Sequence, residues 1–184
     1  MSRTSRYLAL ILRHKPETAG LTLDPKGWAP VQDVLEGLGK AGHHLTLEDL
    51  RALVAADAKG RYAFSPDEQR IRANQGHSVD VDLGLMPVLP PQWLYHGTIA
   101  TFLRAIRSQG LIKGKRHHVH LSPDRDTAGA VGRRRGTPII LIVNALAMHE
   151  AGHAFYRSAN GVWLTDTVPP SYIDFSGTGE NDRV

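Results

Sequence analysis

The chain has 184 residues, of which 41% are hydrophobic, and its 22 Lys and Arg against 18 Asp and Glu give a formal net charge of +4. The apolar share excludes a disordered or fibrous protein and is enough for one large or two small packed domains. There is no cysteine, which excludes disulfides, thiolate metal sites and a thiol nucleophile. With no secretion signal or apolar run of transmembrane length, the sequence predicts a cytoplasmic protein without a membrane partner.

The first half of the chain reads as three helices followed by a β-hairpin. Helical spacing of apolar residues is found at 5–14, 31–38 and 46–54, and alternating residues at 61–64 and 70–73. Thr46 can cap the third helix, with Asp49 as its capping-box partner. Three helices closed by a hairpin are typical of a winged-helix module, so residues 1–80 are predicted to form a nucleic-acid-binding lobe of that kind.

The second half is richer in strands and follows a proline-rich linker between Ser78 and Pro91. Residues 91–178 are predicted to form a second, mixed β lobe, which makes the whole chain an α+β protein. The expected strands lie at 93–96, 119–122, 139–143, 155–156 and 162–165, and the expected helices at 99–109 and 126–131.

Four short islands collect arginine, lysine or histidine, at residues 13–16, 59–62, 95–98 and 131–136. Arginine presents a fixed fork of donors to phosphate oxygens, and histidine can pass a proton, so together they indicate phosphoryl-group chemistry without a metal. Each island alone is equally compatible with a solvated basic surface or, at the end of the first helix, with a simple C-terminal cap.

The island at Tyr95-His96-Gly97-Thr98 is more specific, because a strand ending in glycine lets a ligand approach bare backbone beside two hydrogen-bonding side chains. A core histidine ending a strand is the plainer alternative. His117, His118 and His120 lack an acidic or cysteine partner at metal-site spacing, so no metal is expected. Neither a phosphate-binding Walker loop nor a dinucleotide-binding glycine motif is present.

Taken in order, the islands and the segments between them closely resemble the RNA 2′-phosphotransferase family over nearly the whole chain. The matching segments are 12–16, 27–28, 59–62, 71–78, 94–98, 118–122, 131–136 and 160–165. The longest are Ile-Arg-Ala-Asn-Gln-Gly-His-Ser at 71–78 and Asn-Gly-Val-Trp-Leu-Thr at 160–165. The resemblance implies a winged-helix lobe joined to an ADP-ribosyltransferase-like lobe.

The resemblance also implies the reaction. Members of the family transfer an internal RNA 2′-phosphate, left at a splice junction, to NAD. They act in two steps through an ADP-ribosylated RNA intermediate and yield 2′-OH RNA, nicotinamide and ADP-ribose 1″,2″-cyclic phosphate. The partners expected are therefore 2′-phosphorylated, tRNA-like RNA and NAD as co-substrate, and we expect a monomer that needs no metal.

Carried onto this sequence, the family's catalytic set falls on Arg13, His14, Arg61 and Arg134. The arginines are expected to hold phosphate, and His14 to hydrogen-bond or transfer a proton. Lys59 and Arg72 are predicted to contact RNA phosphates. The NAD site is predicted to consist of His96, Gly97, Thr98, His120, Ser122, Asn160 and Val162. Of these, Val162 stands where many protein-modifying relatives have a glutamate, which fits a substrate that brings its own anionic nucleophile.

Two other functions stay open from the sequence. One is an ADP-ribosyltransferase that stops after the first step and caps terminal phosphates of nucleic acids. The other is a non-catalytic RNA-binding module that does not consume NAD.

Overall fold

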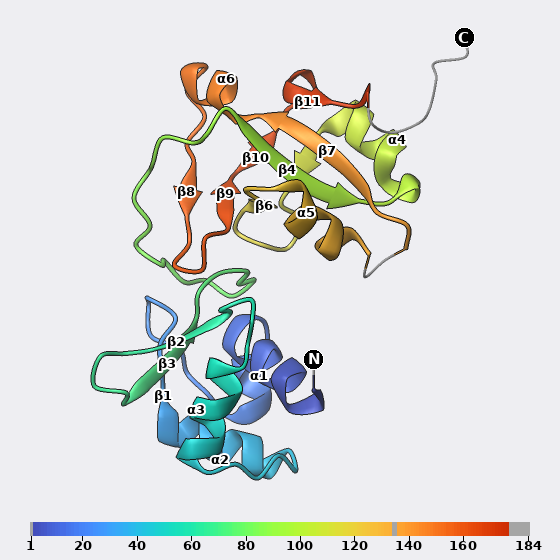
Figure 1. Ribbon diagram of the computed structural model, residues 1–184. Coiled ribbons are helices and arrows are strands. Elements are labelled where there is room, and N and C mark those ends of the chain that lie inside the picture. Colours follow the sequence, from blue (N-terminus) through green and yellow to red (C-terminus); the bar gives the residue numbers. More distant parts are fainter. Residues whose placement is uncertain (1, 134–135, 177–184) are drawn as a thin grey trace. The chain divides into compact units, whose positions relative to one another are not determined.

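The computed structural model describes residues 2–133 and 136–176, and these residues form six α-helices and eleven short strands (Figure 1). The strands pair into small antiparallel sheets, which agrees with the predicted α+β class. The chain divides into two units, Met1–Leu85 and Met86–Val184. No helix in the described residues is both long and apolar enough to cross a membrane.

The N-terminal unit contains the three predicted helices and the predicted hairpin. Its elements are α1 (Arg3–Arg13), a 3₁₀ turn at Pro16–Ala19, β1 (Ala29–Pro30), α2 (Val31–Lys40), α3 (Leu47–Ala55), β2 (Tyr62–Phe64) and β3 (Arg70–Ala73). Thr46 caps α3, and Asp49 completes the capping box, as the sequence predicts. The strand β1 was not predicted, and it extends the hairpin to a three-stranded sheet in the order β1-β3-β2.

The sheet of the N-terminal unit has one face against the helices and one face away from them. Ala29, Ile71 and Phe64 stand opposite one another in register and belong to the apolar core that also takes Leu8 and Leu12 of α1. Because side chains alternate along a strand, the neighbouring pair Ala63 and Arg72 lies on the other face.

The C-terminal unit contains three helices and the remaining strands in the described residues. Its helices are α4 (Ala100–Gln109), α5 (Arg125–Gly132) and α6 (Ala145–Glu150), with a 3₁₀ turn at Pro170–Tyr172. Its strands are β4 (Trp93–Thr98), β5 (Leu111–Ile112), β6 (Val119–Leu121), β7 (Ile139–Asn144), β8 (Tyr156–Arg157), β9 (Trp163–Thr165), β10 (Thr167–Val168) and β11 (Ile173–Asp174). The five predicted strands and the two predicted helices are present, with ends shifted by one or two residues.

Three small sheets build the C-terminal unit, in the orders β11-β7-β4, β6-β9-β8 and β10-β5. The long antiparallel pair β4 and β7 runs through it, as Figure 1 shows. The first two sheets are joined by a bridge in which Tyr95 and Ser122 exchange backbone hydrogen bonds of 2.9 and 2.7 Å. This bridge brings the middle of β4 beside the end of β6, and both segments carry predicted site residues.

Candidate active site

Arg13 and His14 lie at the C-terminal end of α1, as the sequence predicts: Arg13 is the last helical residue and His14 is the C-cap. The segment after the hairpin is bonded to this helix end. The backbone N–H of Ser78 donates to the Arg13 carbonyl (2.8 Å), and the Ser78 hydroxyl lies 2.9 Å from His14 Nδ1. The imidazole is therefore held in one orientation by a residue 64 positions away in the sequence.

Arg61 is held by a carboxylate that the sequence analysis did not single out. Asp57 accepts a hydrogen bond from the backbone N–H of Arg61 (2.6 Å) and forms an ion pair with its Nη1. The two side chains are only 7% and 12% exposed. Among the described residues no other acceptor bonds to the guanidinium, so its Nε and Nη2 edge is left for an oxyanion.

Arg13 and Arg61 meet directly. Arg13 Nη2 donates to the Arg61 carbonyl (3.4 Å), and its guanidinium lies 5.9 Å from the centre of the Tyr62 ring. The Tyr62 hydroxyl donates to the Ser5 carbonyl (3.0 Å), and burial raises the pKa of this phenol. Three of the four predicted catalytic residues thus lie together at one end of α1, on a buried tyrosine.

Asn74, which follows β3, holds the Arg61 segment by hydrogen bonds. Its backbone N–H donates to the Arg61 carbonyl (2.8 Å), and its side-chain amide donates to the Gly60 carbonyl (2.6 Å). Asn74 is 8% exposed, and its Oδ1 is a buried atom without a hydrogen-bond partner in the described residues. The end of the turn that carries Arg61 is therefore held by two residues, Asp57 and Asn74.

The two predicted RNA-phosphate residues lie at different places on the N-terminal unit. Lys59 is exposed and precedes Arg61 by two residues, across Gly60 with its positive φ of 52°. Arg72 projects from the face of the sheet that points away from the helices, where its guanidinium stacks 4.5 Å from the centre of the Trp28 ring. Burial lowers the pKa of Arg72. The fourth predicted catalytic residue, Arg134, lies outside the described residues.

In the C-terminal unit, two hydrogen bonds give the two predicted histidines opposite tautomers. His96 Nδ1 lies 3.0 Å from the His120 carbonyl, which can only accept, so Nδ1 of His96 carries the proton. Arg116 Nη1 lies 2.8 Å from His120 Nδ1 and can only donate, so a neutral His120 carries its proton on Nε2. The Nε2 atom is thus an acceptor in neutral His96 and a donor in His120.

Gly97 has a packing role that the sequence did not indicate. A β-carbon on Gly97 would stand 1.9 Å from the Ala128 carbonyl oxygen and 3.0 Å from the Gly132 nitrogen. Helix α5 therefore packs on bare backbone at this position, and the strand continues through Thr98, which is 7% exposed. The glycine is needed for helix packing, whatever ligand lies beside the strand.

The remaining predicted residues gather around the β6–β9 pairing. His120 stands opposite Leu164 and Leu121 opposite Trp163, so the register carried on by one pair places Ser122 opposite Val162. The turn before Val162 is organised by Ser158, which is 4% exposed. The Ser158 hydroxyl accepts from the Val162 N–H (3.1 Å) and donates to Asn160 Oδ1 (2.8 Å). The fold thus links the segments of His96, His120, Ser122, Asn160 and Val162 in one part of the unit.

Five supporting residues were not assigned a role from the sequence. They are Asp57, Asn74, Ser78, Arg116 and Ser158. Each acts on a predicted site residue that is near in space, and Asn74 and Ser78 belong to a motif that was singled out. The described residues include no group of three or more His, Cys, Asp or Glu side chains placed to hold a metal ion.

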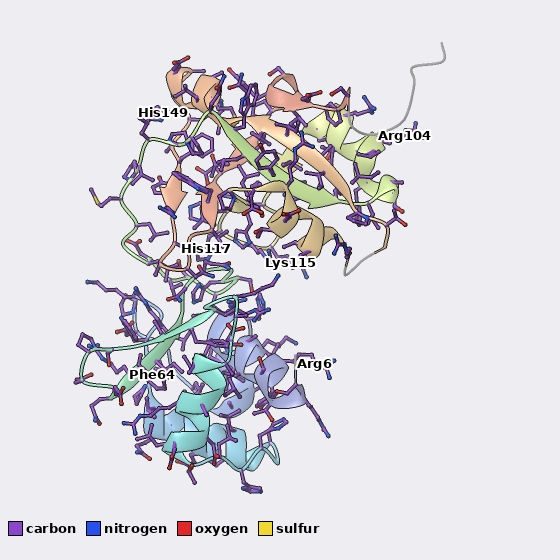
Figure 2. All side chains as sticks on the ribbon, viewed as in Figure 1. Arg6, Phe64, Arg104, Lys115, His117 and His149 are labelled. Atoms are coloured by element: carbon purple, nitrogen blue, oxygen red, sulfur yellow. The ribbon has the colours of Figure 1, made fainter. Side chains whose placement is uncertain are left out.

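Figure 2 shows His117 and Lys115 in the basic segment just before β6.

The sequence matches the model of the RNA 2′-phosphotransferase, Tpt1/KptA family over residues 1–167. A protein of Agrobacterium fabrum is 52% identical over 182 residues, covering 98% of each chain, and one of Hahella chejuensis is 51% identical over 174 residues, covering 95% of this chain and 94% of its own. A protein of Streptomyces griseus is 50% identical over 182 residues, with 95% and 96% covered. All three bear the name "Probable RNA 2′-phosphotransferase". The chain belongs to the RNA 2′-phosphotransferase family, a group of transferases.

Proposed function

We propose that this protein is an NAD-dependent RNA 2′-phosphotransferase that removes an internal 2′-phosphate in two steps. In the first, a 2′-phosphate oxygen forms a bond to the anomeric carbon of the nicotinamide ribose as the bond to nicotinamide breaks, leaving an ADP-ribosylated RNA phosphate. In the second, the adjacent ribose hydroxyl forms a bond to that phosphorus as the bond to the RNA 2′ oxygen breaks. The products are 2′-OH RNA and ADP-ribose 1″,2″-cyclic phosphate.

The observation that carries the proposal is the contact between Arg13 and Arg61 beside an oriented His14, in a chain of this family. The second step spreads negative charge over the phosphoryl oxygens, and donors fixed before the reaction stabilise such charge without reorganising. Asp57 and Asn74 hold Arg61, and Ser78 holds His14, so these donors are fixed in advance. We assign Arg13, Arg61 and Arg134 to phosphate binding and His14 to the proton at the reacting oxygens.

The residues of the C-terminal unit suit NAD as the co-substrate, whose part is to supply an electrophilic anomeric carbon and a leaving group. We assign His96, Thr98, His120, Ser122, Asn160 and Val162, with the backbone at Gly97, to holding it. The hydrogen bonds of His96 to the His120 carbonyl and of Arg116 to His120 fix both rings, and fixed imidazoles suit the hydroxyl and carboxamide groups of NAD, which can donate or accept. Val162 offers no acid or base to activate a protein side chain, which fits an RNA phosphate that brings its own nucleophilic oxygen.

The arrangement of elements supports the two lobes implied by the family. In the N-terminal unit the order is helix, strand, two helices and a hairpin, with the first strand added to the hairpin's edge. We propose that this unit is the winged-helix lobe and that the C-terminal unit is the ADP-ribosyltransferase-like lobe.

Chromatography of the products from a 2′-phosphorylated oligonucleotide and NAD tests the proposal. We expect nicotinamide, 2′-OH RNA and the cyclic phosphate. ADP-ribosylated RNA as the final product would instead identify a capping ADP-ribosyltransferase, and RNA binding without nicotinamide release a non-catalytic module. Either result would refute the proposed reaction.

Variants assign the two steps. Arg61→Ala or His14→Ala should accumulate ADP-ribosylated RNA, because the donors for the second step are lost. His96→Ala should raise the NAD concentration needed for half-maximal rate. Arg51→Ala, which removes an exposed cation of α3, should resemble the wild type and is the matched control. Wild-type product ratios in Arg61→Ala and His14→Ala would contradict the assignment.

A further inference from the structure

A winged-helix lobe is expected to read nucleic acid with its third helix and its wing, but here the start of that helix and the tip of the wing carry acidic residues. Helix α3 begins with Glu48 and Asp49, and the hairpin tip carries Asp67 and Glu68. The cation of α3, Arg51, is already ion-paired with Glu68. A polyanion would be repelled by this surface rather than drawn to it.

The face of the sheet that points away from the helices carries positive charge instead. Arg72 and Arg70 project from β3 on this face, and their guanidinium groups lie 4.5 and 5.7 Å from the centre of the Trp28 ring. Lys26 is exposed two residues before Trp28. We call Lys26, Trp28, Arg70 and Arg72 the Trp28 face. Its acidic neighbour is Asp24, 3.6 Å from Arg70.

Arg72 is the cation of this face whose charge and N–H groups are least satisfied by the described residues around it. Among the described residues no carboxylate lies within ion-pair distance of it. Its Nη1 donates to the Lys26 carbonyl at 3.4 Å, and its Nε is buried without a hydrogen-bond partner in the described part of the chain. Asp24 favours the charge of Arg72 from beyond ion-pair distance, but burial outweighs it, and a phosphate oxygen bound to the guanidinium would offset this cost. Stacking on Trp28 fixes the guanidinium in advance, so little side-chain entropy is lost when an anion binds.

We propose that the Trp28 face binds the phosphate backbone of the RNA that flanks the reacting nucleotide, and that α3 and the hairpin tip do not contact the RNA. Arg72 and Arg70 bind phosphate oxygens, Lys26 adds a mobile cation, and Trp28 holds Arg72 in place. This inference rests on the proposed function for the RNA substrate and adds where that RNA lies on the N-terminal unit.

The salt dependence of RNA binding tests the inference. Binding of a fluorescent, single-stranded, 2′-phosphorylated RNA is measured by anisotropy at several salt concentrations. Each lost phosphate contact should reduce the slope of log K against log salt by roughly 0.7 for a single strand. Arg72→Ala should show this reduction and bind several-fold more weakly. Lys26→Ala, whose exposed side chain supports nothing in the fold, should reduce the slope as well and serves if Arg72→Ala folds poorly.

Arg51→Ala is the matched control, because it also removes one cation from the N-terminal unit, but from α3. It should keep the wild-type slope. A wild-type slope in both Arg72→Ala and Lys26→Ala, or a reduced slope in Arg51→Ala, would overturn the inference. Nicotinamide release by the wild-type protein with the same RNA separates this failure from failure of the proposed reaction, because turnover with unchanged slopes refutes only the Trp28 face.

Discussion

Replacing Asp57 with alanine should lower the free energy of unfolding of the N-terminal unit by about 3 kcal/mol. The carboxylate binds both Nη1 and the backbone N–H of Arg61, and the two side chains are 7% and 12% exposed. Removing one member of a buried ion pair costs about 3–5 kcal/mol, because the other charge stays buried without its partner. The small exposure of Arg61 lets water solvate part of the abandoned guanidinium, which places the expected cost at the lower end.

Urea unfolding of the full chain, followed by circular dichroism and extrapolated to zero denaturant, measures this cost. The control is Glu68→Gln, which removes the acid of the Arg51–Glu68 pair, where the side chains are 48% and 45% exposed. That change should cost less than about 1 kcal/mol, as exposed pairs do. A loss below about 1 kcal/mol in Asp57→Ala, or equal losses in the two variants, would refute the argument from burial.

The same substitution separates orientation of Arg61 from simple stability. If Asp57 fixes the direction of the guanidinium, folded Asp57→Ala should accumulate ADP-ribosylated RNA, as Arg61→Ala should. A variant that is only less stable would contain less active enzyme but would form the wild-type ratio of products.

Two further predictions follow from packing and from burial. Gly97→Ala should prevent stable folding of the C-terminal unit, because its new methyl group would overlap the Ala128 carbonyl of α5. The control is Gly39→Ala in α2, which meets only an ordinary contact and should be neutral or stabilising by up to about 1 kcal/mol. Thermal unfolding of the two variants compares them. Burial lowers the pKa of His118 below its usual 6.5. Below that pH the unfolded chain therefore binds a proton that the folded chain does not. As a result, stability that is present above about pH 6.5 is lost as the pH falls. His118→Gln should flatten this dependence in urea unfolding between about pH 7.5 and pH 5.5, and exposed His44→Gln should not; parallel pH profiles of wild type and His118→Gln would contradict the prediction.

The sequence predicted the longer elements because their patterns are repeated over several residues. Helix α1 repeats its apolar residues at helical spacing, at positions 7, 8, 11 and 12, and β7 begins with a continuous apolar run from Ile139 to Val143. Of the five two-residue strands in the described part of the chain, only β8 was predicted, and β1, β5, β10 and β11 have too few residues to show any period. They exist because partners far along the chain pair with them, as Ile71 of β3 does with Ala29.

The residues that hold the site residues in place were harder to predict than the site residues themselves. Asp57 and Arg61 are four residues apart, but they lie in a turn and not in a helix, so helical spacing rules gave no signal. Ser158 reads as an ordinary turn residue until its hydroxyl is seen to bond Val162 and Asn160. The packing role of Gly97 gave no signal in the sequence, because Ala128, which packs on it, lies 31 positions further along the chain.

Gly132, which ends α5, and Pro138, which precedes β7, meet closely: a β-carbon on Gly132 would come within 2.9 Å of the Pro138 β-carbon. A side chain at position 132 would push Pro138 away and so separate the end of α5 from the start of β7. The absence of a side chain at this one position therefore sets how closely a helix and the central strand of its sheet can approach each other.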